Sequence, residues 1–97
     1  NGTMNREIHI TKQFKKELEK ASKNKMPISE LFSVIEKLQK DEVLNAKHND
    51  HALVGSMKGV RDCHIRPDWV LLYSKEDNGE LHLLHLIRIG SHSQLNL

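Results

Sequence analysis

The spacing of apolar residues changes partway along the chain, and this change limits the fold more than any single motif does. Up to about residue 40, apolar side chains recur every three or four positions, as on one face of a helix. From residue 60 on, runs of β-branched, aromatic and leucine residues follow, with Asp77-Asn78-Gly79 as a strong hairpin signal between two of them. Helices that precede a run of strands, instead of alternating with them, predict an α+β fold.

Two helices are predicted in the first half of the chain. Thr11 is a suitable N-cap for a helix that runs to about residue 23 and carries Phe14, Leu18 and Ala21 on one side. Pro27 marks the start of a second helix, which ends near residue 40. The apolar side of this second helix is formed by Ile28, Leu31, Phe32, Ile35 and Leu38.

Strands are predicted at residues 60–65, 69–74 and 81–89, and a short strand at residues 7–10 is able to join them. We therefore expect an antiparallel sheet of three or four strands with both helices on one face. A chain of 97 residues has room for one modest core, so residues 4–97 are expected to form a single domain. Residues 1–3 precede Met4 and are expected to be a remnant of recombinant expression.

Composition excludes some classes of protein. No apolar run approaches the roughly 20 residues of a membrane-spanning helix, and we expect a soluble, cytoplasmic protein without a membrane partner. The one cysteine, Cys63, cannot form an intramolecular disulfide and is expected to be buried and inert. The net charge is only +2, but seven histidines are many for so short a chain and need an explanation.

A metal site is one interpretation of the histidines, because imidazole is a common ligand for zinc and other transition metals. His82 and His85 are three residues apart in a predicted strand and so project from opposite faces. His48 and His51 lie close together in a predicted loop, but their spacing is not specific for a metal. The sequence therefore ranks a metal-binding module last among its interpretations.

The densest group of reactive residue types is at positions 62–69, with Asn49-Asp50-His51 before it and residues 88–92 after it. Each piece has a structural explanation, since polar residues at strand ends are usually exposed, Pro67-Asp68 is typical of a turn, and Trp69 suits a core. Together the pieces suit cleavage of a phosphodiester without a metal. Histidine can act as base and acid near neutral pH, and arginine or lysine can stabilise charge at phosphorus.

The same residues carry a family resemblance. The resemblance lies in residues 49–55, 58–73 and 88–93, and residues 11–18 look like the family's opening segment. The motifs DxH and HIxPDW lie within residues 58–73, and GSHS lies within residues 88–93. From about Ile8 onward the chain resembles the YafQ branch of the RelE-like bacterial toxins. The resemblance implies two helices against an antiparallel sheet. It also implies a ribosome-dependent, metal-independent endoribonuclease of a type II toxin–antitoxin system, which cuts messenger RNA in the ribosomal A site through attack of the 2′-hydroxyl.

The resemblance also assigns roles to residues. His92 is the hypothesised general acid, and the general base and its orientation come from the other catalytic positions, with the identity of the base left open. Arg88 is expected on the same side of its strand as Leu84 and Leu86, where its guanidinium stabilises the charge on the phosphorane. The catalytic positions are His51, His64, Asp68 and His92, and the expected substrate-binding positions are Arg88, Trp69, Arg61, Lys58 and Asn96.

Two features leave alternatives open. Asn96 stands where the family often has an aromatic residue that stacks on a base, and its amide offers a hydrogen bond to a base edge instead. The lysines of the first helix form either a solvated face or a surface that binds ribosomal RNA. These are Lys12, Lys15, Lys16, Lys20 and Lys23.

The partners expected from the resemblance are the ribosome, messenger RNA and a cognate antitoxin. This antitoxin is DinJ/RelB-like and acidic or amphipathic, and it contacts operator DNA through its own DNA-binding half, so that the toxin reaches DNA only indirectly. The main alternative to the enzyme is a toxin-like binding protein that has lost efficient cleavage and acts as an antitoxin partner or transcriptional co-repressor. Asn96 is the feature that favours this alternative.

Overall fold

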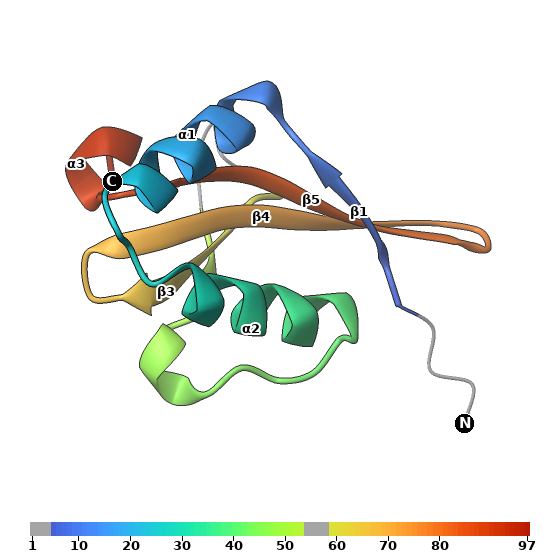
Figure 1. Cartoon of the computed structure of the whole chain (residues 1–97). Helices are drawn as coiled ribbons and strands as arrows, with labels where there is room; N and C mark the ends of the chain where they lie inside the picture. The colour runs from blue at the N-terminus through green and yellow to red at the C-terminus, as the bar shows by residue number, and fades with distance from the viewer. Residues whose placement is uncertain (1–4, 54–58) are drawn as a thin grey trace.

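The computed structural model describes residues 5–53 and 59–97, so Lys58, one of the expected substrate contacts, lies outside the described residues. Within these ranges no helix is both long and apolar enough to cross a membrane. Figure 1 shows the elements in chain order. They are β1 (Glu7–Ile10), α1 (Lys12–Lys23), α2 (Ile28–Gln39), the 3-10 turn η1 (Ala46–His48), β2 (His51–Ala52), β3 (Arg61–Arg66), β4 (Trp69–Asn78), β5 (Leu81–Gly90) and α3 (His92–Leu95).

The sheet has the strand order β1-β5-β4-β3-β2. The α+β class is confirmed, but in the described part of the chain the sheet has five strands instead of three or four, and it is mixed because β1 runs parallel to β5. Consecutive strands β2 to β5 are joined by short connections, which favour antiparallel pairing. β1 pairs with a strand more than 70 residues later, so no local turn fixes its direction. β2 is only two residues long and leaves no readable pattern in the sequence.

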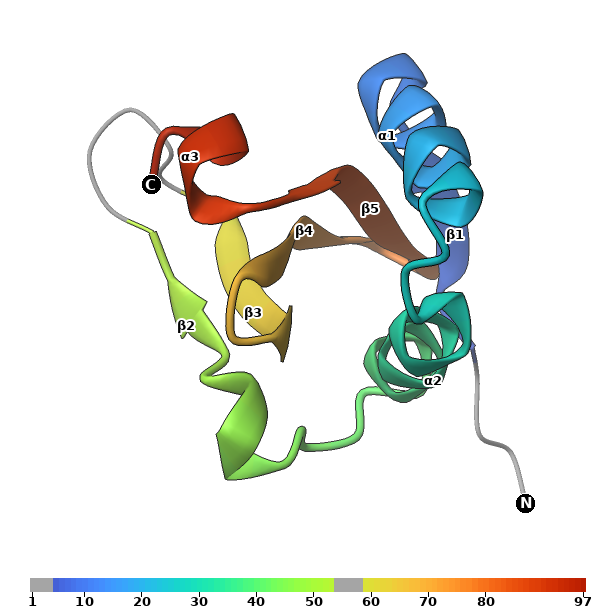
Figure 2. The ribbon, with the colours of Figure 1, turned by 60° about the vertical axis from the view of Figure 1, so that its left-hand side comes forward.

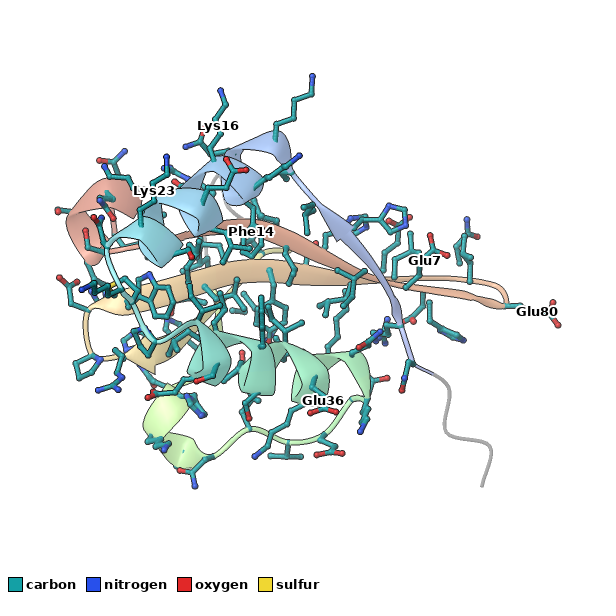
Figure 3. All side chains as sticks on the ribbon, in the orientation of Figure 1. Glu7, Phe14, Lys16, Lys23, Glu36 and Glu80 are labelled. Carbon is teal, nitrogen blue, oxygen red and sulfur yellow. The ribbon has the colours of Figure 1, made fainter. Side chains whose placement is uncertain are left out.

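The two long helices form where the sequence predicts them. The side chain of Thr11 accepts a hydrogen bond from the backbone N–H of Phe14 (2.9 Å) and caps α1. Phe14 points into the core, whereas Lys16 points away from it (Figure 3). In α2 one prediction was wrong: Phe32 is 53% exposed, and Val34 is buried in its place. Val34 lies three residues after Leu31 and therefore shares the buried face of α2, whereas Phe32 lies outside this face.

The core lies between the sheet and the two long helices. In Figure 2, α1 and α2 lie together beside the sheet, and α3 lies apart from them. Cys63 and Tyr73 of the sheet are buried against this helix layer, as predicted for Cys63. Burial raises the pKa of the Cys63 thiol, so the thiol stays protonated at neutral pH. The opposite face of the sheet carries a smaller apolar cluster of Val70, Leu72 and Leu95.

β4 and β5 form a long hairpin whose turn contains Gly79 with φ of +64°. This conformation favours glycine, and the predicted hairpin signal is confirmed. The hairpin projects beyond its neighbours (Figure 1). Its register shifts once, because Tyr73 pairs with Leu86 whereas Leu72 pairs with Arg88. The extra residue puts Arg88 on the opposite face from Leu84 and Leu86, so the face expected for Arg88 from simple alternation was wrong.

Candidate active site

Three histidines from distant parts of the sequence meet on the sheet face that turns away from α1 and α2. We call them the histidine row: His51 at the start of β2, His64 in β3 and His92 at the start of α3. The ring centroids of His51 and His64 are 6.5 Å apart. Those of His64 and His92 are 5.0 Å apart, with the rings nearly perpendicular. The structure thus brings together all three histidines that the resemblance placed at catalytic positions.

Strand register explains this convergence. His51 lies directly opposite Asp62 in the β2–β3 ladder. Asp62 and His64 are two residues apart in one strand and therefore share a face. His64 in turn pairs with Val70, which pairs with Gly90 of β5, so the chain leaves the sheet beside His64 just before His92.

Asp68 holds His92 in place. Asp68 lies in the turn between β3 and β4, and its Oδ1 accepts hydrogen bonds from the backbone N–H (2.9 Å) and from Nδ1 (2.7 Å) of His92. The backbone bond first, and then the imidazole bond, hold the pKa of the Asp68 carboxyl below its ordinary value. With Nδ1 of His92 bound to this anion, Nε2 is the ring nitrogen that remains for proton transfer.

Asp62 is a residue of the site to which the sequence assigned no role. Its Oδ1 is 3.3 Å from Nε2 of His64, and its Oδ2 is 3.9 Å from Nε2 of His51. The residue is only 3% exposed. The DxH motif was its signal in the sequence, because alternation in a strand puts the aspartate and histidine of that motif on one face.

Arg88 is bound to the first helix. Its Nε (3.1 Å) and Nη2 (2.6 Å) donate to the carboxylate of Glu17, which also accepts the backbone N–H of Ile89 (3.0 Å). Burial opposes the charge on Glu17, but these bonds and one from Gln13 outweigh it and hold the pKa of Glu17 below its ordinary value. The guanidinium is therefore fixed in orientation at the edge of the site.

A groove of about 550 Å³ runs between α1 and the end of β5 and adjoins the site. Lys16 and Lys20 of α1 line one side, and Asp68 and Ser91 line the other. Trp69 also lines it, but this residue is only 4% exposed and packs with the helix-side core. All five lysines predicted to bind ribosomal RNA are exposed on α1, and two of them face this groove.

Gly90 lies close to Gln94 in the wall of this groove. A Cβ atom at Gly90 would lie 2.8 Å from Oε1 of Gln94. The same oxygen accepts the backbone N–H of Ser91 (2.8 Å), while Ser91 caps α3. A side chain at position 90 would require the end of the Gln94 side chain to move, which would disturb its hydrogen bond with the Ser91 N–H.

Two of the expected substrate contacts lie elsewhere. Arg61 pairs with Tyr73 and so faces the helix side of the sheet, where its Nε donates to Asp50 (3.1 Å). It is not brought to the histidine row. Asn96 is exposed and ends α3 with φ of +59°, a left-handed conformation that asparagine tolerates better than most residues. The position of Asn96 therefore has a backbone explanation.

The remaining histidines make separate contacts. Nδ1 of His48 donates to the carbonyl oxygen of His64 (2.7 Å) and so supports β3 from outside the row. His9, His82 and His85 lie toward the other end of the hairpin, each beside a carboxylate. Among residues 5–53 and 59–97, no group of three or more histidine, cysteine or acidic side chains has the geometry to hold a metal ion.

Comparison with known proteins decides the family. A sequence model described as "Bacterial toxin of type II toxin-antitoxin system, YafQ" matches residues 6–97. The chain belongs to this family. It is 35% identical to the mRNA interferase toxin YafQ of Escherichia coli K12 over 91 residues, which cover 93% of this chain and 95% of the relative.

Solved structures of the family have the same fold. The toxin of the E. coli DinJ–YafQ toxin–antitoxin complex superposes with a TM-score of 0.83 at 34% identity, covering 95% of this chain and 98% of that one. A copper-bound mutant toxin from Helicobacter pylori superposes with a TM-score of 0.85 at 40% identity, covering 92% of this chain and 97% of that one. The resemblance inferred from the sequence motifs is therefore confirmed, and so is the α+β fold that it implied.

Proposed function

We propose that this member of the YafQ toxin family is an endoribonuclease that cuts messenger RNA in the ribosomal A site. The family match and the E. coli relatives named as mRNA interferase toxins support a messenger-cleaving toxin. The observation that carries the finer proposal is the histidine row, in which neighbouring imidazoles lie beside carboxylates at a site edged by cationic side chains. This is the set of groups needed to move protons during attack of a 2′-hydroxyl on its own phosphodiester.

In the proposed reaction, His51 or His64 removes the proton of the 2′-hydroxyl while the 2′-oxygen forms a bond to phosphorus. The bond from phosphorus to the 5′-oxygen breaks, and His92 donates a proton to that oxygen from Nε2. The products are a 2′,3′-cyclic phosphate and a 5′-hydroxyl. Asp68 supports the acid, because its hydrogen bond to Nδ1 fixes the ring with Nε2 directed away from the carboxylate.

Arg88 is proposed to stabilise the negative charge that develops on the phosphorane. Two of its five N–H groups bind Glu17, which leaves three for a phosphate oxygen. The ion pair holds the guanidinium in place before substrate arrives, so little side-chain entropy is lost on binding. Lys16 and Lys20 in the adjoining groove add positive charge where the RNA backbone leaves the site.

The lysines on the rest of α1 are proposed to bind phosphates of ribosomal RNA. A cognate antitoxin is the proposed protein partner, because DinJ occupies that role in the E. coli complex with YafQ. Operator DNA is then reached only through the antitoxin. With these partners, the proposed location of the protein is the cytoplasm, where translation takes place.

A toxin-like binding protein without efficient cleavage is the second candidate, favoured by Asn96 where the family often has an aromatic residue. Mapping the 5′ ends of messenger fragments after induction tests both candidates. The enzyme produces new ends at a fixed position within codons and in the reading frame. Growth arrest that the antitoxin relieves accompanies these ends. Cuts that ignore the reading frame contradict ribosome dependence, and an absence of cuts favours the binding protein.

A further inference from the structure

We propose that Asp62 is a positioning residue shared by the two candidate general bases. Its carboxylate would hold and stabilise the imidazole of His64 or His51 once that ring takes the 2′ proton. The inference rests on the proposed RNA cleavage and adds a residue to it. The proton stays on the imidazole, and Asp62 acts through its charge and position alone.

Burial is the first observation behind this proposal. Asp62 is 3% exposed, and its Oδ1 accepts no hydrogen bond from the described residues. A buried carboxylate oxygen without a donor costs free energy, because it has lost water and gained nothing equivalent. Buried polar atoms without a partner are rare in folded proteins and require an explanation. A partner that forms only when a nearby ring becomes protonated is such an explanation.

The positions of the two rings are the second observation. Nε2 of His64 faces Oδ1 of Asp62 at 3.3 Å, which leaves Nδ1 of His64 on the side away from the carboxylate. Nδ1 of His51 already donates to the carbonyl of Asn49 (2.7 Å), so Nε2 is its basic nitrogen. That Nε2 is 3.9 Å from Oδ2 of Asp62. One carboxylate thus lies beside both bases, and such contacts often shorten when substrate binds.

The contrast with Asp68 gives the third observation. The side chain of Asp68 is 71% exposed, whereas that of Asp62 is 5% exposed. A general acid must give up its proton, and a fully buried anion beside it would oppose that step. A general base gains positive charge in the same step, so a poorly screened anion beside it lowers the barrier. The exposure of Asp68 suits its place beside the acid, and the burial of Asp62 suits its place beside the bases.

The test is Asp62→Asn, which keeps the volume and removes the charge. The matched control is Glu76→Gln, a carboxylate beside His85 at the far end of the hairpin. With translating ribosomes as substrate, we expect Asp62→Asn to lower kcat by about 100-fold with little change in KM, and Glu76→Gln to leave both unchanged. The acid limb of the pH–rate profile moves to lower pH in Asp62→Asn, because an amide no longer favours the protonated ring.

Among the described residues, the charged or titratable groups near the pair include His92, Asp68, Arg88 and His48, and all of them remain in both variants. Thermal unfolding distinguishes a positioning role of Asp62 from a structural one. Asp62→Asn is expected to be as stable as the parent or more stable, since an unpartnered charge is removed. A loss of stability with an unshifted pH profile would assign Asp62 a structural role and overturn the proposal.

Titration of the imidazole signals by NMR in the free proteins keeps the test independent of catalysis. In Asp62→Asn the midpoints of His51 and His64 move to lower pH, and that of His85 does not. Unchanged midpoints overturn the inference, even if the parent protein cuts RNA. If the parent cuts no RNA but the midpoints move, the proposed function fails while the coupling of Asp62 to the two rings stands.

Discussion

Histidines lie beside carboxylates at both ends of the β4–β5 hairpin, but the two groups differ in their surroundings. Near the hairpin turn, His82 pairs with Asp77 (2.7 Å) and His85 pairs with Glu76 (2.8 Å). Both carboxylates are more than half exposed. At the other end, His64 contacts Asp62, whose side chain is 5% exposed. Exposure of the rings does not separate the groups, because that of His92 (37%) lies between those of His82 (39%) and His85 (32%).

Because such pairs occur at both ends, a histidine–carboxylate pair alone is a weak sign of function. Exposed pairs are screened by water and contribute little. Proximity of the rings does not separate the two groups either, because the ring centroids of His9 and His85 are 5.7 Å apart. The site end differs in two respects: one carboxylate is buried, and the other binds a backbone N–H as well as a ring. We therefore propose a chemical role for the histidine row and not for the pairs near the turn.

Removing a histidine from each end of the hairpin is expected to give very different results. His92→Ala should lower the rate of messenger cleavage by about 10²- to 10⁴-fold, because the proton donor to the 5′-oxygen is lost. His82→Ala removes an imidazole from an equivalent exposed pair and should leave the rate at the parent value. Single-turnover cleavage on stalled ribosomes measures both. Equal losses in the two variants would mean that the two groups do not differ in function.

The next effect concerns the partner carboxylates. Asp68→Asn should lower the rate by about 10- to 100-fold, because His92 loses its fixed orientation. Asp77→Asn, the matched change near the turn, should not affect it. Hydrogen bonds to His92 and His82 hold the pKa of both carboxyls below the ordinary value of 3.8. Asp68 therefore stays ionised down to that pH.

The ionised state of Asp68 determines how its contribution to stability and rate depends on pH. Asp68 stabilises the folded protein above its unfolded pKa, and that contribution is lost as pH falls through the lower folded value. The ratio of parent to Asp68→Asn rates should stay constant from about pH 5 to 8 and shrink only in stronger acid. Rates measured across this range check the ratio. A ratio that changes near neutral pH would show that Asp68 itself titrates there.

A smaller effect concerns binding. Reversing the charge of Lys16 and Lys20, which line the groove beside the site, should weaken ribosome binding and reduce its salt dependence. Each lost phosphate contact lowers the slope of log affinity against log salt by about 0.7 to 0.9. Reversing Lys37 of α2 and Lys40, which caps the C-terminal end of α2, makes the same change in net charge away from the groove. If both pairs change the slope equally, α1 has no special role in binding.

The smallest effect separates two roles of Asn96. Asn96→Gly keeps access to the left-handed conformation and removes the amide, whereas Asn96→Ala disfavours that conformation as well. We expect Asn96→Ala to lose about 1 kcal/mol of stability and Asn96→Gly less. Chemical denaturation measures both. If codon preference also changes in Asn96→Gly, the amide contacts a base. If it does not, Asn96 only ends α3.

Much of the fold could be predicted from the sequence, because its signals are local. The cap at Thr11, the apolar faces of both helices and the turn at Gly79 depend on neighbouring residues. The parallel pairing of β1 depends on a strand more than 70 residues later, and the bulge that reverses Arg88 is a one-residue irregularity within the β4–β5 hairpin. No local sequence pattern predicts either feature. The same bulge explains why strict alternation gave the wrong face for Arg88.

The candidate site could be predicted only in part. The motifs placed His51, His64 and His92 together, and the structure brings their rings into one row. Asp62 received no role from the sequence because its significance lies in its burial and in the ring of β2 opposite, which only the folded chain reveals. Arg61 carried a plausible charge, but alternation in β3 turns it toward Asp50.

The proposed proton transfer by the histidine row, during attack of a 2′-hydroxyl on the adjacent phosphate, leaves characteristic ends on the cut messenger. We predict a 2′,3′-cyclic phosphate, or the 3′-phosphate formed from it, on one fragment and a 5′-hydroxyl on the other. A messenger with a 2′-deoxy nucleotide at the cut position should not be cleaved. Fragments that carry 5′-phosphates, or cleavage of the 2′-deoxy messenger, would contradict the account.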